Sequence, residues 1–455
     1  MASNPPLPPA QSRDHASRAA VAETLRRIER LDPLVNAFTD VTAERANRAA
    51  EALDAGRATG PLAGVPFAVK NLFDIAGLPT RAGSRINRDR APAERDSPLI
   101  SRLEAAGAIL VGALNMGEYA YDFTGENVHD GHCHNPHALD HMAGGSSSGA
   151  GAAVAAGLVP LALGSDTNGS IRVPAAFCGV FGLKPTFGRL SRAASFPFVT
   201  SLDHLGPFAR SVRLLAGAYD AMQGPDADDP TCTARLPEPS VAQLDDGPGS
   251  LRIAVAGGYF ATGGDADAYR AVAAVAAALG ASRTIDIPEA ARARAAAYLI
   301  TASEGAALHL DRLRSRPADF DPAVRDRLIA GAMMPASWVN RAHRFRRWYG
   351  ERFAELFKDV DIILAPSTPC RAPKLGQTTL VFGGQELPLR PNIGVYTQPI
   401  SFAGLPVAAV PVFLDGGLPL GVQVIGAPWR EDSVLRIAAF LEREGVAAAP
   451  IAALG

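Results

Sequence analysis

The chain has 455 residues, of which 47% are hydrophobic and 20% are charged, and its formal net charge is -2. These values are typical of a globular protein with a substantial core; they exclude a disordered chain and provide no basic surface field for nucleic-acid binding as the main function. The four cysteines are widely spaced, which argues against a disulfide framework and favours a reducing, cytoplasmic compartment.

Two segments bear on export and on membranes. The first twenty residues contain no apolar core that could serve as a signal peptide. The longest weakly polar run, residues 149–164, is too short and too rich in glycine and alanine to span a bilayer. We therefore expect no export and no membrane partner.

Helices and strands are expected to alternate along the chain, as in an α/β protein. Residues 1–60 are predicted to form two surface helices with charged outer faces, over 16–32 and 42–56. The later expected elements are a buried strand over 66–73, a helix and strand over 97–112, a helix over 149–157, strands over 161–163 and 179–186, a strand over 251–260, helices over 265–281 and 339–359, strands over 360–366, 407–413 and 420–426, and a last helix over 433–442.

Residues 224–250 stand out by composition, because they are rich in proline, aspartate and glycine. Predicted strands on both sides of this segment can belong to one sheet, so we interpret it as a loop excursion and not as a domain boundary. No repeat of fixed period is visible. We expect a single domain over residues 1–455.

Lys70 is the first residue of chemical interest, because it lies in an apolar strand between Val69 and Leu72. An ordinary lysine is almost always charged at pH 7, whereas burial can lower its pKa to ~7–8, where it can act as a general base. The alternative is an ion-paired lysine at the end of a strand.

Residues 129–141 contain five histidines and one cysteine, side chains that commonly bind metals. Imidazole and thiolate are good zinc ligands, but this segment contains glycine and proline and no second ligand cluster follows it. We therefore expect histidines that form hydrogen bonds or face water, and no metal. The six residues are His129, His132, Cys133, His134, His137 and His141.

The stretch GGSSSG, residues 144–149, matches the G-x-S-x-G pattern of the α/β-hydrolase nucleophile elbow, which would make Ser147 the nucleophile. That motif needs a buried strand before it and a catalytic histidine after it. The preceding residues are polar and turn-like, and the later histidines His309 and His343 lie in predicted helices. This hypothesis is therefore disfavoured.

The loop GSDTNGS, residues 164–170, offers a different arrangement. Asn168 and Gly169 can adopt the positive φ angles of a tight turn. Such a turn can direct successive backbone N–H groups to one point, as an oxyanion requires, with Ser170 beside it. Taken alone, the segment is also compatible with an ordinary turn.

Residues 144–186 resemble the signature block of the amidase signature family, and residues 61–84 resemble its lysine block. The resemblance extends over nearly the whole chain. It implies an α/β amidase-signature fold, in which a large mixed central β-sheet is covered on both faces by helices. It also implies an amidase that hydrolyses linear amide C–N bonds without a cofactor. The further matching segments are 115–127, 201–212, 361–373, 400–412 and 417–429.

The resemblance implies a Ser-cisSer-Lys triad. Ser170 matches the nucleophile that forms the acyl-enzyme, Ser146 matches the bridging serine that follows a cis peptide bond, and Lys70 matches the base. The oxyanion and substrate-binding residues that it implies are Thr167, Asn168 and Gly169.

The chain departs from the common family pattern at two positions. Asn168 and Ser148 stand where many members have glycine. A positive φ is still allowed for asparagine, and the Asn168 side chain can reach a substrate. Asp166 and Arg172 flank the nucleophile, and we interpret both as scaffold charges that hold the loop.

Within the family, residues 121–137, 166–179 and 196–212 are most similar to the 1-carboxybiuret hydrolases of cyanuric acid breakdown. This resemblance implies hydrolysis of a small, anionic, urea-like amide with release of ammonia. A carboxylate on the substrate requires cations or N–H donors, and Arg189 and Arg192 are candidates.

The same resemblance implies an oligomer and a small helical partner subunit similar to the C subunit of tRNA-dependent amidotransferases, with no direct nucleic-acid contact. Two alternatives remain open: the A subunit of a Glu-tRNA(Gln) amidotransferase, which releases ammonia from glutamine with the same triad, and a broad-specificity amidase. A binding protein without catalysis would be expected to lack a triad residue, and none is missing.

Overall fold

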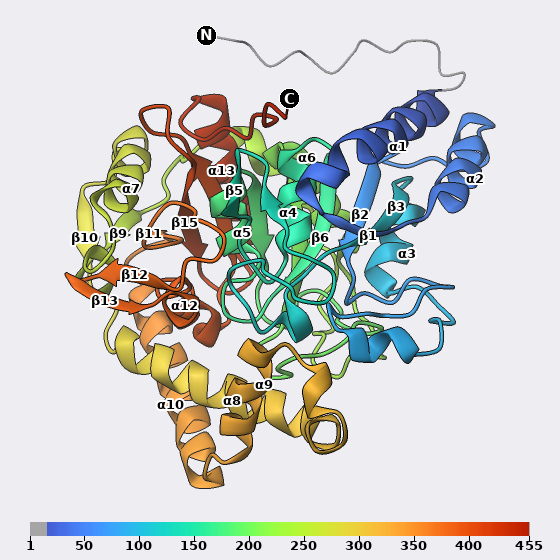
Figure 1. Cartoon of the computed structure of the whole chain (residues 1–455). Helices are drawn as coiled ribbons and strands as arrows, with labels where there is room; N and C mark the ends of the chain where they lie inside the picture. Colours follow the sequence, from blue (N-terminus) through green and yellow to red (C-terminus); the bar gives the residue numbers. More distant parts are fainter. Residues whose placement is uncertain (1–15, 455) are drawn as a thin grey trace.

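A mixed sheet of 11 strands runs through the centre of the computed structural model, which describes residues 16–454 (Figure 1). The strand order is β1-β3-β2-β6-β8-β7-β14-β15-β11-β9-β10. The strands are β1 Phe38–Val41, β2 Pro66–Lys70, β3 Ile109–Leu114, β6 Leu161–Asp166, β7 Phe181–Lys184, β8 His204–Ala209, β9 Ile253–Ala256, β10 Arg283–Ile285, β11 Ile362–Pro366, β14 Val407–Val412 and β15 Leu420–Gly426.

Parallel and antiparallel pairs alternate in blocks across this sheet. β2 is parallel to both of its neighbours, β3 and β6, whereas the pairs from β6 to β11 are antiparallel. The helices are α1 Ala16–Val35, α2 Ala43–Asp54, α3 Pro98–Ala105, α4 Ser148–Ala155, α5 Arg172–Cys178, α6 Val212–Met222, α7 Ala266–Ala278, α8 Ala290–Ser315, α9 Pro322–Ala332, α10 Ala336–Leu356, α11 Leu389–Asn392, α12 Gln398–Ala403 and α13 Glu431–Arg443.

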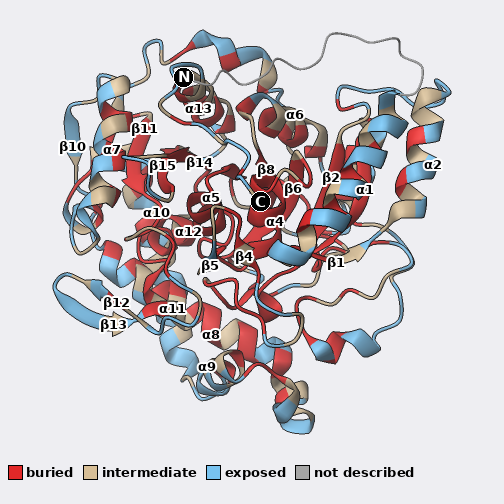
Figure 2. Cartoon of the chain, turned by 45° about the horizontal axis from the view of Figure 1, so that its top comes forward, coloured by how far each residue is buried: buried red, intermediate tan, exposed pale blue. Residues whose placement is uncertain are grey.

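The two faces of the sheet bury different apolar residues, because successive side chains of a strand point to opposite faces. Phe67 and Val69 of β2 join Leu161 and Leu163 of β6 in one core cluster, whereas Ala68 belongs to another. The first cluster includes side chains of α3, α6 and α13, and the second includes side chains of α1, α2 and α4. Helices thus cover both faces, as predicted, and the central strands are buried (Figure 2).

Three helices, α8, α9 and α10, pack together at one end of the molecule, below the sheet in the view of Figure 1. α8 also contacts α12. Thr397, the residue before α12, donates a hydrogen bond to the backbone carbonyl oxygen of Asn168, so α12 begins close to the carboxyl end of β6. Two small hairpins complete the fold: β4 His134–Asn135 with β5 Ala138–Met142, and β12 Thr379–Phe382 with β13 Gln385–Pro388.

Most of the predicted elements form within a few residues of their expected bounds. The strand expected over 251–260 is shorter, since β9 ends at Ala256 and residues 258–261 form a 3-10 turn. Residues 224–250 contain no strand and only a 3-10 helix, Val241–Asp246. The signal-peptide expectation concerns residues 1–15 in large part, which lie outside the described residues. No helix of residues 16–454 is both long and apolar enough to cross a membrane.

Candidate active site

The ends of two parallel strands define the site. β2 ends at Lys70 and β6 ends at Asp166, and because these strands are parallel their carboxyl ends lie at the same edge of the sheet. Helix α4 packs on both strands, and the serines at residues 146–148 stand at its N-terminus. The fold thereby brings together the predicted base, the triple serine and the predicted oxyanion loop.

The Lys70 side chain is fully buried and its Nζ contacts three hydroxyl groups, at 2.7 Å from Ser146 Oγ, 3.1 Å from Ser147 Oγ and 2.8 Å from Ser165 Oγ. Burial lowers the pKa of Lys70 to about 7, although nearby carboxylates, Asp203 first among them, act in the opposite direction. A neutral amine has two N–H donors and one lone pair, so it can satisfy three hydroxyl contacts as well as an ammonium group can.

The peptide bond between Gly145 and Ser146 is cis, as the family resemblance implies for the bridging serine. Ser147, which the nucleophile-elbow hypothesis would use, donates its hydroxyl to the carbonyl oxygen of Ser165 at 3.0 Å and accepts from the Ser165 N–H at 3.2 Å. A strand, β5, does precede the triple serine, but it belongs to a two-stranded sheet outside the central one. The local structure therefore differs from a nucleophile elbow.

Residues 167–171 connect β6 to α5 and form the predicted oxyanion loop. Gly169 has a φ of +141°, and a Cβ there would collide with the Thr397 side chain, so this position requires glycine. Asn168 does not have a positive φ, and that expectation is wrong. The Asn168 side-chain amide nitrogen donates to Thr301 Oγ1 at 2.9 Å, and the Asn168 backbone carbonyl oxygen accepts from Thr397 Oγ1 at 2.7 Å, so two other elements hold the loop.

The Asn168 side-chain oxygen is buried and has no hydrogen-bond partner among the described residues. Asn168 lines the same cleft as Ser170. A buried acceptor without a partner is costly, and an N–H group of a bound amide or urea would satisfy it.

A buried ion pair fixes the start of α5. Asp166 Oδ2 and Oδ1 accept from Arg172 Nε and Nη2, each at 2.9 Å, and both side chains are fully buried. Burial alone would raise the pKa of Asp166, but the adjacent Arg172 outweighs this effect and holds the pKa below its usual range. Arg172 also donates to Gln423 Oε1 at 2.7 Å. The pair acts as the scaffold that the sequence suggests.

Ser170 lines a narrow cleft whose walls also carry two arginines from distant parts of the chain, Arg327 of α9 and Arg390 of α11. The Arg327 guanidinium lies 3.8 Å from the ring centroid of Tyr121 and donates through Nε to the carbonyl oxygen of Ala323 at 2.8 Å. Its Nη2 donates to the carbonyl oxygen of Tyr121, and within residues 16–454 its Nη1 has no hydrogen bond. Arg327 therefore keeps a donor for a ligand.

Arg390 is held by two carboxylates. Its Nη1 and Nη2 donate to Asp122 Oδ1 and Glu126 Oε2, each at 2.7 Å. The Asp122 carboxylate also accepts from the N–H groups of Thr124 and Gly125, so its position is fixed by the loop that follows. Two carboxylates thus orient the Arg390 guanidinium group at the cleft in advance.

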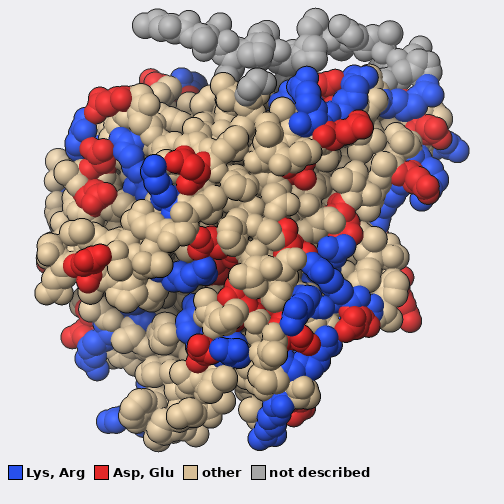
Figure 3. Space-filling model, in the orientation of Figure 1, with Lys and Arg blue, Asp and Glu red and all other residues tan. Residues whose placement is uncertain are grey.

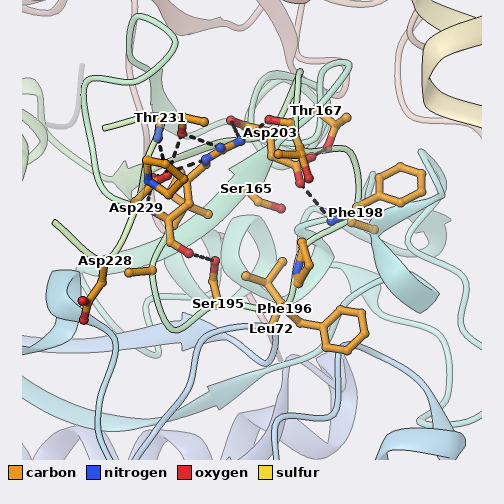
Figure 4. A pocket seen from close by; sticks show the side chains of 17 residues that line it. Leu72, Ser165, Thr167, Ser195, Phe196, Phe198, Asp203, Asp228, Asp229 and Thr231 are labelled. Atoms are coloured by element: carbon orange, nitrogen blue, oxygen red, sulfur yellow. Dashed lines mark hydrogen bonds and ion pairs between the residues drawn. The ribbon is translucent and has the colours of Figure 1, made fainter. Parts of the chain in front are cut away.

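A second cavity, of about 240 Å³, adjoins the cleft and shares Ala120, Thr167 and Phe198 with it. Ser165, the hydroxyl partner of Lys70, lies among the side chains of this cavity in Figure 4. Thr167 Oγ1 donates to Asp203 Oδ1 at 2.6 Å at one side of it. The cavity therefore reaches the machinery around Lys70 and the oxyanion loop.

The two arginines proposed from the sequence as substrate cations do not serve this cleft. Arg189 lines neither cavity and donates to Tyr219 Oη at 3.0 Å in the protein interior. Arg192 lines the larger cavity, but it donates to the carbonyl oxygen of Thr200 at 2.6 Å and forms an ion pair with Asp229 at 3.5 Å. Both arginines have structural partners.

The histidines of residues 129–141 bond to protein groups. His129 Nε2 lies 2.9 Å from Glu118 Oε1, and His137 Nε2 lies 3.1 Å from the carbonyl oxygen of Cys178. Among residues 16–454 no group of three or more histidine, cysteine, aspartate or glutamate side chains is arranged to hold a metal ion.

Comparisons with known proteins agree with this picture. The profile of the family described as "Amidase" matches residues 19–435. The chain is 54% identical over 438 residues to the AtzE subunit of the 1-carboxybiuret hydrolase of Pseudomonas sp. (strain ADP), covering 95% of this chain and 96% of that one. It is 38% identical to the A subunit of the glutamyl-tRNA(Gln) amidotransferase of Anaeromyxobacter sp. (strain K), covering 94% and 93% of the two chains.

Solved structures give the same relationships. One, described by the words "an unexpected vestigial protein complex reveals the evolutionary origins of an s-triazine catabolic enzyme", has a TM-score of 0.94 and 53% identity, covering 95% of this chain and 96% of that one. The A subunit of the glutamyl-tRNA(Gln) amidotransferase of Thermotoga maritima has a TM-score of 0.82 and 28% identity, covering 99% and 100% of the two chains.

Proposed function

The chain belongs to the amidase family and is an amide-cleaving hydrolase, and from this premise we propose that it hydrolyses 1-carboxybiuret, or a closely similar carboxylated urea, with release of ammonia. The observation that carries the proposal is that a buried lysine and serine pair occurs in the same structure as a small cleft that carries positive side chains. Lys70 is hydrogen-bonded to Ser146 and to Ser165 of β6, and the loop that follows β6 carries Ser170 into a cleft with two guanidinium groups.

In the proposed mechanism, Lys70 is the base, Ser146 the proton relay and Ser170 the nucleophile. Neutral Lys70 accepts a proton from Ser146 Oγ while Ser146 accepts one from Ser170 Oγ, which attacks the amide carbonyl carbon. The backbone N–H groups of Thr167, Asn168 and Gly169 stabilise the oxyanion, together with that of Ser170. Donors of this kind typically contribute about 3–4 kcal/mol each.

Collapse of the tetrahedral intermediate breaks the C–N bond, and Ser146 returns the proton to the departing nitrogen, which leaves as ammonia. Water then attacks the acyl-enzyme by the same relay in reverse and releases the acid. The pKa of Lys70, about 7, suits this role, because the residue can gain and lose a proton near neutral pH.

The charges of the two cavities favour one orientation of an anionic substrate. The cleft presents Arg327 and Arg390 with one carboxylate, that of Asp122, whereas the larger cavity presents the carboxyl groups of Asp203, Asp228 and Asp229 with one guanidinium, that of Arg192. The formal charge of the first set is positive and that of the second is negative, so a carboxylate is attracted to the first and repelled by the second. We place the substrate carboxylate at Arg327 and Arg390 and its urea N–H groups toward Asn168 Oδ1.

The size of the cleft favours a small substrate over the bulky amides of a broad-specificity amidase. Its free volume is only about 20 Å³, little more than the space of one water molecule. Even a urea derivative requires some rearrangement of the walls of this cleft.

We also propose a cytoplasmic location and a small helical partner subunit. Two observations support the partner: both relatives are named as subunits, and the similar solved structure is described as a protein complex. The four cysteines are free in the structure, as expected for a reducing compartment.

The experiment is to measure ammonia release from a panel of amides: 1-carboxybiuret, its neutral analogue biuret, glutamine and benzamide. We expect turnover of 1-carboxybiuret with a kcat/KM at least about a hundredfold above that of biuret, since the lost contact is a charge-assisted one. Hydrolysis of glutamine in preference to 1-carboxybiuret would instead favour the amidotransferase alternative.

A further inference from the structure

The three hydroxyl groups around Lys70 are not equivalent as hydrogen-bond partners. Ser147 Oγ donates its proton to the carbonyl oxygen of Ser165 at 3.0 Å, so it can only accept from Lys70 Nζ. It also accepts from the Ser165 N–H at 3.2 Å, and its contact with Nζ, at 3.1 Å, is longer than those of the other two hydroxyl groups. One N–H of Lys70 is therefore committed to Ser147, through a bond that is long and shared.

A neutral Lys70 amine then has one N–H and one lone pair for the other two hydroxyl groups. If the lone pair accepts from Ser146, the remaining N–H must be donated to Ser165 Oγ, which lies 2.8 Å from Nζ. In the reverse arrangement Ser165 donates to the lone pair, and Ser146 accepts the N–H and has no base. The direction of the Ser165 hydroxyl proton thus selects between a productive and an unproductive orientation of the amine.

The Ser165 hydroxyl can donate its proton away from Lys70. Within residues 16–454, Ser165 Oγ forms a hydrogen bond with Lys70 and with no other group. The Ser165 side chain nevertheless lines the larger cavity, of about 240 Å³, as Figure 4 shows. This volume is sufficient for several water molecules. A water molecule in the cavity accepts the Ser165 proton and leaves Ser165 Oγ free to accept from Lys70.

We propose that Ser165 is a positioning residue: its hydroxyl accepts one N–H of Lys70, donates its own proton to water in the larger cavity, and thereby leaves the Lys70 lone pair to Ser146. This role rests on the proposed function, in which Lys70 is the base. When the Ser146 proton passes to Lys70 Nζ, the resulting ammonium group donates to all three hydroxyl groups, and neither Ser165 nor Ser147 has to turn. Ser165 itself gains and loses no proton in the cycle.

Charged groups also act on Lys70, and a substitution at Ser165 leaves them in place. Burial lowers the pKa of Lys70, and three carboxylates oppose this effect. β3 and α4, which pack on β2, carry no charged side chain, and α1 buries only apolar side chains and one threonine. The charged groups are Asp203, Asp166 with its partner Arg172, and Asp122 with its partner Arg390. A change in the Lys70 pKa on substitution of Ser165 therefore reports the lost hydroxyl.

The test is an NMR titration of the full chain, purified with any protein that accompanies it and labelled with 13C at the ε position of lysine. The chain has only four lysines, of which Lys358 and Lys374 are exposed, and Lys70→Met identifies the Lys70 signal. Ser165→Ala removes an acceptor that stabilises the ammonium form more than the neutral amine. We therefore expect the pKa of Lys70 to fall, with a rise of about tenfold in its acid dissociation constant. Ser165→Thr keeps a hydroxyl and should restore the constant to within about threefold.

The pH dependence of turnover provides a second readout. In Ser165→Ala the transition in kcat/KM should move to lower pH together with the pKa of Lys70. The plateau above the transition should fall about tenfold, because Lys70 becomes a weaker base and its lone pair is less fixed toward Ser146. Ser165→Thr should recover both. The matched control is Ser195→Ala, which should change neither, since Ser195 lines the same cavity but donates to the carbonyl oxygen of Arg192 at 2.6 Å.

An unchanged or higher pKa of Lys70 in Ser165→Ala overturns this role, whatever happens to turnover. A merely structural contribution of Ser165 predicts that result, with a lower thermal midpoint and slower turnover but no change in the Lys70 titration. Failure of Ser165→Thr to restore the pKa also overturns it. The titration needs no substrate, so these outcomes differ from a failure of the proposed function, which is the absence of 1-carboxybiuret hydrolysis by the original chain.

Discussion

At the scale of single residues, the chemistry that we propose depends on a lysine that is kept out of water. Lys70 has no charged partner in hydrogen-bond contact among residues 16–454; its Nζ meets only hydroxyl groups, those of Ser146, Ser147 and Ser165. Hydroxyl groups stabilise an ammonium ion less than a carboxylate does, so desolvation dominates and the neutral amine becomes accessible near neutral pH.

This environment predicts the pH dependence of activity. Burial lowers the pKa of Lys70 to about 7, so the residue is protonated and inactive below that pH and neutral and active above it. We therefore expect kcat/KM to rise with pH through a transition near 7 and to level off above it, with a slope of one on logarithmic axes. The measurement is initial ammonia release at several pH values in buffers of constant ionic strength. A profile that falls as pH rises from 6 to 8 would contradict the role of Lys70 as base.

Arg327 and Arg390 predict how the enzyme selects its substrate. Arg327→Gln removes a cation with a free donor, so KM for 1-carboxybiuret should rise about tenfold to a hundredfold, with little change in the turnover of neutral biuret. Arg390→Gln should act in the same direction and also leave Asp122 without its partner. The matched control is Arg325→Gln on the same helix as Arg327, since Arg325 pairs with Asp326 and lines neither cavity. An equal loss on charged and neutral substrates would place the carboxylate elsewhere.

At the scale of elements, the unit that matters is β6, its loop and α5. β6 delivers Ser165 and Asp166, the loop delivers Ser170, and the pair between Asp166 and Arg172 fixes the angle at which α5 leaves. Thr397, at the start of α12, holds the loop from the opposite side. The loop is thereby rigid before substrate arrives, which is what electrostatic stabilisation of a transition state requires.

Removing one partner of the buried pair tests this unit. Arg172→Met leaves the Asp166 carboxylate buried and unpaired, so the free energy of unfolding at pH 7 should fall by about 3–5 kcal/mol. The double variant Asp166→Asn/Arg172→Met removes the isolated charge and should recover part of the loss. Denaturant unfolding of the three proteins measures both effects. A single variant as stable as the original would show that the pair is not a scaffold.

The elements that the sequence predicts best are those with a strong local pattern. β2, β6, β14 and β15 each contain a short apolar run, and α13 buries one apolar face, so each is recognised without tertiary information. β1 and β10 are only four and three residues long and partly exposed, so no periodicity marks them. β8 contains glycine and proline, which ordinarily indicate a turn, and it becomes a strand only because two neighbouring strands pair with it.

At the scale of the whole molecule, the site gathers residues that are far apart in the chain. The sequence predicts Lys70, Ser146 and Ser170 as site residues because they lie in blocks that resemble a known family, and the fold places Lys70 Nζ 2.7 Å from Ser146 Oγ. Arg327 and Arg390 lie more than a hundred residues later without any local motif, and only the packing of α9 and α11 against the cleft brings them there. Arg189 and Arg192, in contrast, lie just after the signature block in the sequence, but neither side chain lines the cleft that contains Ser170.

The distribution of charge over the surface bears on the classes of partner that the protein can bind. Positive and negative side chains are mixed over the face shown in Figure 3, without a single-sign field large enough to attract nucleic acid. The charges for which we propose a function are therefore local ones, the two arginines of the cleft, Arg327 and Arg390.

The measurement that tests the central claim most directly is ammonia release from 1-carboxybiuret by Ser170→Ala beside Ser147→Ala. We predict that Ser170→Ala lowers kcat by about a thousandfold or more in a folded protein, because it removes the attacking oxygen. Ser147→Ala should keep most of the turnover, because Ser147 Oγ only bonds Ser165 and Lys70 in the core. Full activity of Ser170→Ala, with loss of activity in Ser147→Ala, would contradict the account and return the nucleophile to the triple serine.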